Sequence, residues 1–483
     1  EYLLGHGADP NLADDLGEAP LHSAIGSGRP TAEIEACLGL LLAHGADPGA
    51  PDLNGHTPLR HALWAGERPA LRLLEQHGAP MYRPRPRWEP PGEIIRLVER
   101  ILTEAWNGPV VLGDCYQLRG ERVLRFEIAA APEGGDRPAP ASVVVKQARR
   151  DAARPYDPDT ADQPNGAWGL FEDWAGTRLF SSLPNGADYA TRFYGGDRTA
   201  GVIVIEDLGD GEALVDCLMG DDPKRAEEGL LLLARCLGQM HAATVGLHDR
   251  YWGYRDALGP RLDRAGRQLH NGQLRELQQG FAAIGVRPAS GFEAEFQQVA
   301  AAISDPGPFL AYVHGDPCPD NCRILDGKLR LFDFETSGFQ HALLDAVYGR
   351  LTFPTCWCVN RLPAHIAPMM ESVYRAELVQ TCPAAGDDRR FQRELVHCCA
   401  FWVIWQGEWR LENAGRDDSR WGISTWRQRV LVRLDALAGA TEEFHHLPAM
   451  GETARRCTER LRQIWPAEAD QMPLYPAFRG EAG

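Results

Sequence analysis

The pattern of apolar and polar positions divides the chain into three stretches. Over residues 1–80, short apolar clusters alternate with glycine-containing turns, which predicts short helices. Residues 93–210 begin with a helical pattern and continue with runs of β-branched residues that predict strands. Within residues 211–483, apolar positions recur mostly with the period of a helix, and a long helix is expected over Pro223–Ala243. The pattern therefore predicts an α+β protein.

The first stretch contains an internal repeat. The segment His6–Pro10 recurs unchanged as His44–Pro48 and begins again at His77. Between the copies, Gly17–Ala24 and Gly55–Ala62 follow the pattern G-x-T-P-L-H-x-A. These motifs resemble ankyrin repeats, in which each unit is a turn and two short helices. Such a unit buries its apolar face only by stacking on its neighbours, here with the leucines of its second helix.

Residues 1–80 hold two full units and the tail of a third, and an ankyrin array usually needs at least three. We therefore expect either further repeats ahead of Glu1 or packing on the next domain. The chain begins without Met and in mid-pattern, so we expect it to be a fragment or an incomplete reading frame. The repeats are either a binding surface for another protein or a cap on the following domain. Residues 81–92, which are rich in proline, are expected to be a semi-rigid linker.

The stretch after the linker reads as a helix followed by strands. Apolar positions from Glu93 to Trp106 have the helical period. The strands are expected at Tyr116–Leu118, Val123–Ile128, Ser142–Gln147 and from Val202 onward, with a turn at Gly120 and a further helix over Leu170–Phe180. The strand Ser142–Gln147 carries Lys146 after three valines, which places an ammonium group at the edge of an apolar cleft.

The most informative segment is Ala311–Glu335. A short apolar run ends in His314-Gly315-Asp316, and Asn321 follows in the same loop. A hairpin then brings in Asp333; its strands are expected at Cys322–Leu325 and Lys328–Phe332, joined by Asp326-Gly327. Asp-Gly is the dipeptide that tight hairpin turns prefer, since both central residues need positive φ. The hairpin fixes Asp316, Asn321 and Asp333 near one small sheet element.

These three side chains suit phosphoryl transfer. One carboxylate orients the attacking hydroxyl and accepts its proton, while a second carboxylate and an amide oxygen hold the magnesium ions that neutralise the nucleotide phosphates. Single Asp and Asn residues are common in turns, so each alone would indicate only a loop. The ordered set of H-G-D, Asn321, a hairpin and D-F-E is far more specific.

The segment resembles the aminoglycoside phosphotransferase and choline kinase family, whose members phosphorylate small molecules. The H-G-D of His314–Asp316 is closer to the aminoglycoside kinases, and the D-F-E of Asp333–Glu335 is closer to the choline kinases. The resemblance covers residues 93–440. It implies a two-lobed protein-kinase-like fold, here preceded by an all-α ankyrin-repeat segment. The nucleotide lobe would be residues 93–210, and the catalytic and substrate lobe residues 211–483.

The resemblance also implies roles for individual residues. Asp316 is the expected catalytic base, and Asn321 and Asp333 are the expected magnesium ligands. Lys146 would contact the α- and β-phosphates of ATP and pair with an acid on the following helix. That acid is Asp173 or Glu172, and the register favours Asp173. Backbone groups from Glu206 to Leu208 would bind adenine. Asp345 would brace the catalytic loop, and His241 is expected to be a packed core residue.

The substrate is less well defined than the reaction. The resemblance allows a small alcohol, and an amino sugar or amino alcohol would suit an acidic protein. Trp402, Trp405 and Trp409 lie at helical spacing, and several glutamates are near them in the sequence, including Glu394, Glu408 and Glu412. A tryptophan stripe of this kind indicates a helix core, which is our preferred interpretation. The alternative is an aromatic and acidic wall for a cationic substrate. One alternative is a non-catalytic pseudokinase that acts through its ankyrin repeats. The missing Arg beside Asp316 and the missing A-P-E segment argue against a protein kinase.

Composition narrows the partners. The formal net charge of −17 argues against nucleic acid or an anionic membrane as a partner. The given sequence has no apolar run long enough to span a bilayer, and we expect no signal peptide. Its 12 cysteines follow no disulfide or zinc spacing, so we expect reduced, buried thiols in a cytoplasmic protein. Cys318 and Cys322 lie inside the catalytic loop, where oxidation would interfere.

Overall fold

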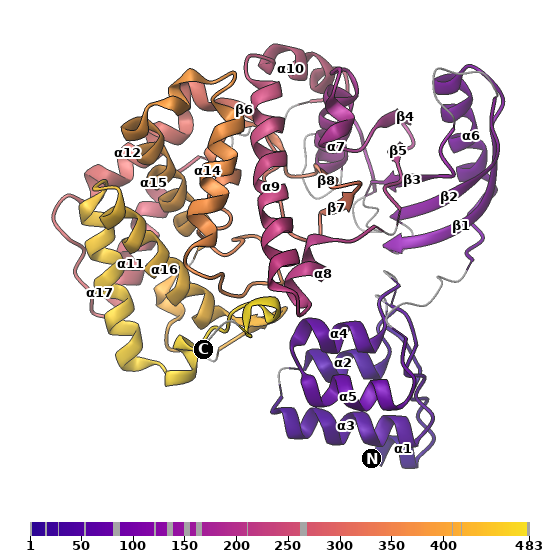
Figure 1. Ribbon diagram of the computed structural model, residues 1–483, viewed down its shortest axis with the longest axis horizontal. Helices are drawn as coiled ribbons and strands as arrows, with labels where there is room; N and C mark the ends of the chain where they lie inside the picture. The colour runs from indigo at the N-terminus through magenta and orange to yellow at the C-terminus, as the bar shows by residue number, and fades with distance from the viewer. Residues whose placement is uncertain are drawn as a thin grey trace. The chain divides into compact units, whose positions relative to one another are not determined.

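The computed structural model describes most of the chain. The described residues are 2–14, 17–27, 29–52, 55–80, 87–119, 122–132, 139–148, 155–160, 167–209, 211–260, 268–407, 409–416 and 418–480. They form two compact units (Figure 1). The first unit comprises residues 1–181, 191–210 and 258–260, and the second comprises residues 182–190, 211–257 and 261–483. The predicted turn at Gly120, the first half of the predicted linker (residues 81–86) and Glu408 lie outside the described residues.

The repeats at the N-terminus fold as the predicted pairs of short helices. These helices are α1 (Tyr2–Gly5), α2 (Pro20–Gly26), α3 (Thr31–Ala43), α4 (Pro58–Ala65) and α5 (Arg68–Gln76). Helix α2 packs on α3 and on α4, and α5 packs on α3 and α4. Their buried core contains Leu21, Ile25, Ile34, Leu38, Leu41, Leu59 and Leu74. Stacking thus buries the apolar faces that a single unit exposes.

The second part of the first unit is an antiparallel sheet of five strands. The strands are β1 (Val111–Arg119), β2 (Val123–Ala130), β3 (Ser142–Gln147), β4 (Phe193–Asp197) and β5 (Val202–Glu206), in the order β1-β2-β3-β5-β4. Two helices, α6 (Gly92–Trp106) and α7 (Ala167–Ser181), pack against its strands. The two predicted helices and strand β3 are confirmed, while β1 begins earlier than expected.

Strand β3 has its two faces in different surroundings. Val143 and Val145 are fully buried in a core formed with α6. Because side chains alternate along a strand, Val144 and Lys146 project from the opposite face. Strand β3 pairs with both β2 and β5, with Lys146 opposite Ile203. Its central position fixes the direction in which Lys146 leaves the sheet.

The second unit is largely helical. Its helices are α8 (Leu214–Met219), α9 (Pro223–Thr244), α10 (His248–Asp256), α11 (Asn271–Ala283), α12 (Phe292–Ser304), α13 (Leu343–Ala346), α14 (Ile366–Leu378), α15 (Asp388–Trp405), α16 (Trp426–Glu443) and α17 (Pro448–Ile464). Helix α9 is the predicted long helix, and α14, α8 and α13 pack against it (Figure 1). The Asp222 carboxylate caps α9 by accepting the N–H groups of Lys224 and Arg225.

Three two-stranded ladders complete the second unit. They are β6 (Leu310–Val313) with β9 (Gly338–His341), β7 (Cys322–Leu325) with β8 (Lys328–Leu331), and β10 (Arg420–Trp421) with β11 (Ser424–Thr425). The predicted hairpin is β7–β8. Its turn residues Asp326 and Gly327 have φ of 49° and 74°, as the Asp-Gly pair requires. The loop that carries the H-G-D motif begins where β6 ends.

The predicted tryptophan stripe divides into buried and exposed members. Trp402 and Trp409 are each 1% exposed, whereas Trp405 is 39% exposed. Helix α15 ends at Trp405, so Trp409 is not on the helix; it packs against Phe281 and Phe292 instead. The helix-core interpretation is therefore right for Trp402, while long-range packing buries Trp409. The hollow lined by Trp405 and Trp409 measures about 30 Å³, room for about one water molecule and not for an amino sugar.

Among the described residues, no single helix is long and apolar enough to cross a membrane. The helices Pro223–Thr244 and His248–Asp256 together have the length and composition of a membrane span, but the chain bends by 85° at their junction.

Candidate active site

The H-G-D segment is held by one buried carboxylate. Asp345, on α13, accepts hydrogen bonds from the backbone N–H groups of His314 (2.7 Å) and Gly315 (3.0 Å). His241, on α9, lies 3.2 Å from the same carboxylate and 2.8 Å from the hydroxyl of Tyr374 on α14. Asp345 is 1% exposed and His241 is fully buried. Both the bracing position of Asp345 and the core position of His241 agree with the sequence prediction.

Asp345 remains ionised because of these donors. Burial alone would raise the pKa of its carboxyl group. The hydrogen bond from His241, the charge of that ring and the backbone N–H of His314 together hold the pKa below its ordinary value. The loop is thus anchored on a charged group that three elements share.

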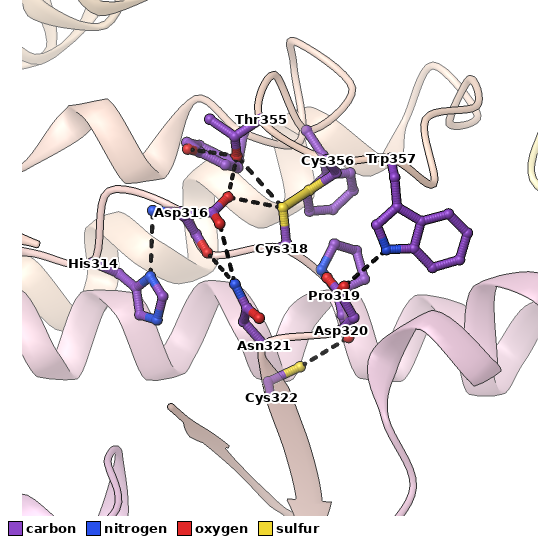
Figure 2. Close-up of a disulfide and its surroundings, with 12 residues drawn as sticks. His314, Asp316, Cys318, Pro319, Asp320, Asn321, Cys322, Thr355, Cys356 and Trp357 are labelled. Atoms are coloured by element: carbon purple, nitrogen blue, oxygen red, sulfur yellow. Dashed lines mark hydrogen bonds between the residues drawn. A yellow bond between two sulfur atoms is a disulfide. The ribbon is translucent and has the colours of Figure 1, made fainter. Parts of the chain in front are cut away.

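Asp316 and Asn321 face each other across the loop (Figure 2). The Asn321 Nδ2 atom donates to the backbone carbonyl of Asp316 (3.1 Å) and lies 3.3 Å from Oδ2 of its carboxylate. These bonds define which end of the amide is nitrogen, and they leave Oδ1 of Asn321 as the atom that can ligate a cation.

His314 ties the start of the loop to the D-F-E motif. Its Nδ1 atom accepts the N–H of Asp316 (3.3 Å), and its Nε2 atom lies 3.0 Å from the carbonyl of Phe332. The Phe332 N–H in turn donates to the carbonyl of Asn321 (3.1 Å). Asp333 follows with a φ of 70°, a left-handed conformation that is uncommon for any residue other than Gly, Asn or Asp. The tertiary contacts thus fix Asp316, Asn321 and Asp333 on one connected framework.

The donor atoms on this framework fit magnesium. The amide oxygen of Asn321 and the carboxylate of Asp333 are hard oxygen ligands, and both side chains are half-buried. A further carboxylate, Asp320, is close enough to Asp333 that the charge of Asp333 contributes to raising its pKa, after the larger effect of burial. The local excess of negative charge favours a divalent cation.

The structure places the sheet lysine beside an acid on α7. The Lys146 Nζ atom lies 2.5 Å from Oδ2 of Asp173, and the two side chains are 13% and 2% exposed. The neighbouring Glu172 is also buried. Of the two acids that the sequence left open, Asp173 is therefore in contact with Lys146. The pair can orient an ammonium group toward an anionic ligand such as a nucleotide phosphate.

The segment expected to bind adenine is anchored by its side chains. The Glu206 N–H donates to the carbonyl of Arg192 (2.8 Å), so this N–H is engaged within the sheet. The Asp207 carboxylate accepts a hydrogen bond from the Ser142 hydroxyl (2.7 Å), and its Oδ2 atom lies 2.6 Å from Arg125 Nε. Leu208 is half-buried. The sequence prediction missed Asp207, whose bonds to β2 and β3 fix the end of β5.

The prediction that all cysteines are reduced is wrong for one pair. Cys318 and Cys356 form a disulfide, with their Cα atoms 5.6 Å apart. Thr355 and Trp357, on either side of Cys356, donate hydrogen bonds to Asp316 and Asp320 of the catalytic loop (Figure 2). No spacing rule in the sequence links these residues, because the fold alone brings the segment 355–357 to the loop.

Comparison with protein-family models gives a match for the N-terminal repeats and a match for a central part of the chain. Residues 152–357 match the phosphotransferase enzyme family, and residues 1–83 match ankyrin repeats in three copies. No curated protein sequence matches this chain. The chain thus contains a domain that matches the phosphotransferase enzyme family, and ankyrin repeats precede it at the N-terminus.

Several solved kinase structures are similar at low sequence identity. Choline kinase LicA from Streptococcus pneumoniae is 14% identical and aligns over 72% of this chain and 99% of its own, with a TM-score of 0.35. A choline/ethanolamine kinase family protein from Mesorhizobium loti is 15% identical over 72% and 93%, with a TM-score of 0.33. A thermostable mutant of aminoglycoside phosphotransferase APH(4)-Ia is 13% identical over 76% and 99%, with a TM-score of 0.30. The family assignment rests on the sequence match.

Proposed function

We propose that this protein transfers the γ-phosphoryl group of ATP to a hydroxyl group of a small molecule in a magnesium-dependent reaction. The observation that carries the proposal is the loop in which Asn321 holds Asp316 while Asp345 holds the backbone ahead of it. A carboxylate fixed in this way is pre-organised to orient a hydroxyl group, which is the main protein contribution to phosphoryl transfer.

In this proposal each predicted residue has one task. Asp316 accepts the proton of the acceptor hydroxyl as the new O–P bond forms. Lys146, oriented by Asp173, neutralises the α- and β-phosphates. Asn321 and Asp333 would hold magnesium, which when bound neutralises charge on the phosphates. The backbone from Glu206 to Leu208 would contact adenine through groups other than the Glu206 N–H.

The acceptor class and the role of the repeats belong to the same proposal. An amino sugar or amino alcohol suits the acidic chain, and the ankyrin units supply a surface for a protein partner. In this proposal the chain consists of the repeats (1–80), a linker (81–92), the nucleotide lobe (93–210) and the catalytic lobe (211–483).

A two-stage experiment tests the proposal. Thermal unfolding with Mg-ATP at ~100 times its dissociation constant should show a stabilisation of ~2.7 kcal/mol. This shift should require magnesium and be lost in Asp333→Ala, but persist in Asp249→Ala, which changes an exposed carboxylate on α10. In a screen of amino alcohols and amino sugars, Asp316→Ala should abolish turnover and keep the shift. No shift in the wild type would favour a non-catalytic scaffold instead.

A further inference from the structure

The segment Thr355–Trp357, here called the strap, lies along the catalytic loop and makes a contact with it at every residue (Figure 2). Thr355 Oγ1 donates to Oδ1 of Asp316. Cys356 is bonded to Cys318, and Trp357 Nε1 donates to Oδ2 of Asp320 at 2.8 Å. The disulfide is the middle of three successive links and the only covalent one.

Thr355 of the strap is hydrogen-bonded to Oδ1 of Asp316, a carboxylate oxygen that the proposed reaction needs as a proton acceptor. Thr355 presents an alcohol O–H to Asp316 in the way an acceptor molecule would, while Asn321 Nδ2 lies 3.3 Å from the other carboxylate oxygen. The Cys318 sulfur lies 2.9 Å from the same Oδ1, which further crowds it. In this arrangement the hydroxyl of Thr355 stands where a substrate hydroxyl would have to bind.

The backbone just ahead of the strap is strained. Thr352 and Phe353 have φ of 53° and 56°, and two consecutive left-handed residues other than glycine are unfavourable, the more so for a β-branched one. Hydrogen bonds on both sides hold this segment, among them the bond from Arg433 Nε to the carbonyl of Leu351 (3.3 Å). They also include those of Arg429, whose guanidinium donates to the carbonyls of Cys356 (2.8 Å) and Trp357 (3.1 Å). Loss of the disulfide removes the strongest link and lets the strain draw the strap away.

We propose that Cys318 and Cys356 are a redox-controlled modification site, whose disulfide holds Thr355 on Asp316 and keeps the phosphotransferase in a resting form. Activation is reduction by a dithiol. The dithiol gives two electrons and two protons to the pair, the S–S bond breaks to two thiols, and the dithiol becomes a disulfide. Both sulfurs are buried, so the dithiol reaches the pair during transient local opening in which the catalytic loop and the still-linked strap move together. This inference rests on the proposed function.

The test compares the oxidised and dithiothreitol-reduced full chain, with each state verified by mass after alkylation. Hydrogen–deuterium exchange of residues 353–358 should rise on reduction. Turnover of ATP should rise about tenfold or more, as expected for freeing a carboxylate from one charge-assisted hydrogen bond. Thr355→Val should raise the turnover of the oxidised form and bring the ratio of the two states near one. Cys457→Ala, which removes a free buried thiol on α17, should leave the ratio unchanged.

Other results would overturn the inference. Equal exchange in both states would mean that the disulfide does not hold the strap. Lower turnover after reduction, or lower turnover of Thr355→Val in both states, would mean that the strap supports Asp316 rather than blocking it. If neither state binds Mg-ATP, the proposed function fails, and the exchange of residues 353–358 still decides whether the pair controls the strap.

A separate observation concerns the ankyrin units. Asp52, His56 and His61 place three metal-ligating atoms within 4.8 Å of one another. The Asp52 Oδ2 atom is 3.4 Å from His56 Nδ1 and 3.2 Å from His61 Nε2. Donors of a tetrahedral zinc site, each ~2.0–2.1 Å from the metal, are themselves about 3.4 Å apart. Two of the three distances between donor atoms, those from Asp52 to His56 and from Asp52 to His61, therefore already have the length that a zinc site requires.

Neighbouring rings restrict both imidazoles. His22 packs edge-on against His61 with the ring centroids 4.7 Å apart. Trp64 packs edge-on against His56 with the ring centroids 4.5 Å apart, which restricts the orientation of that ring.

We infer that Asp52, His56 and His61 form a divalent transition-metal site, with zinc the best fit to two imidazoles and a carboxylate. Equilibrium dialysis of the full chain against zinc should show one bound ion fewer in the double variant His56→Asn/His61→Asn. The control His44→Asn, which changes an exposed ring 2.9 Å from the carbonyl of Leu40, should retain the wild-type count. Cobalt should give a visible spectrum that the double variant loses. An unchanged zinc count and spectrum in that variant would refute the site.

Discussion

At the scale of single residues, the structure brings one of two neighbouring acids, Asp173, into contact with Lys146. Both Asp173 and Glu172 are buried on α7, and the sequence allowed either. An Asp side chain is one methylene group shorter than a Glu side chain, yet the charged atoms of Lys146 and Asp173 are 2.5 Å apart. The helix therefore approaches β3 closely enough for the shorter acid.

The two acids should respond differently to substitution. Asp173→Asn removes the charge that orients Lys146, so we expect Mg-ATP to bind at least about tenfold more weakly, equivalent to ~1.4 kcal/mol. Glu172→Gln is the matched control and should change the affinity by less than about twofold. Isothermal titration calorimetry measures both. A larger loss in Glu172→Gln would transfer the orienting role to Glu172.

Asp345 combines three donors on one buried group, and its removal leaves them unpaired. Asp345→Ala should destabilise the second unit by about 2–4 kcal/mol, because the N–H groups of His314 and Gly315 are both buried. Urea unfolding measures the loss. The pKa of Asp345 is lower in the folded protein than its ordinary value of ~3.9 in the unfolded chain. The stabilisation by Asp345 is therefore present above pH ~3.9 and is lost as the pH falls through the pKa of the folded state. A change below about 0.5 kcal/mol would contradict the bracing role.

At the scale of elements, α15 is joined to the segment between α16 and α17 by a chain of imidazoles. The His397 Nδ1 atom lies 2.9 Å from Glu394, and its Nε2 atom lies 2.9 Å from Nε2 of His446. One imidazole must donate and the other accept across this second contact, so the pair cannot hold two full charges. Burial, followed by the charges of His397 and Arg393, lowers the pKa of His446 to about 4.

This contact should make stability depend on pH. Unfolded His446 takes up a proton below its ordinary pKa of ~6.5, whereas the folded protein does so only near pH 4. The unfolded state binds more protons in this window, so stability falls as the pH is lowered from 6.5 to 4. In His446→Gln the fall should be shallower, as measured by Tm across that range. Parallel curves for the two proteins would exclude His446 as a source of the pH dependence.

At the scale of the whole molecule, the ankyrin units and the antiparallel sheet have separate cores. The first core includes Leu38 and Leu74, and the second includes Val98 and Leu124. Each core is closed by its own elements. Cooperative unfolding follows a shared core, so the two parts are expected to unfold in separate transitions.

Calorimetry of the full chain tests this separation. Leu38→Ala should lower only the ankyrin transition, by an amount equivalent to about 2–5 kcal/mol, because Leu38 is fully buried. Mg-ATP should raise only the transition of the phosphotransferase part. A single transition that both changes shift together would show that the parts unfold as one cooperative unit.

The sequence by itself determined the features that depend on near neighbours. The repeat motifs of residues 1–80, the helix α9 and the hairpin β7–β8 follow from local periodicity and from turn residues such as Asp326-Gly327. The order of Asp316, Asn321 and Asp333 likewise identified the family before any contact was known. These signals lie within short segments, where a few residues set the backbone conformation.

Only the tertiary structure decided the contacts between distant segments. It paired Cys318 with Cys356, placed Thr355 on Asp316, selected Asp173 as a contact of Lys146, and buried Trp409 outside its expected helix. None of these pairings leaves a periodic trace in the chain. Each results from the packing of whole elements, in which many weak contacts act together, and no local pattern encodes their sum.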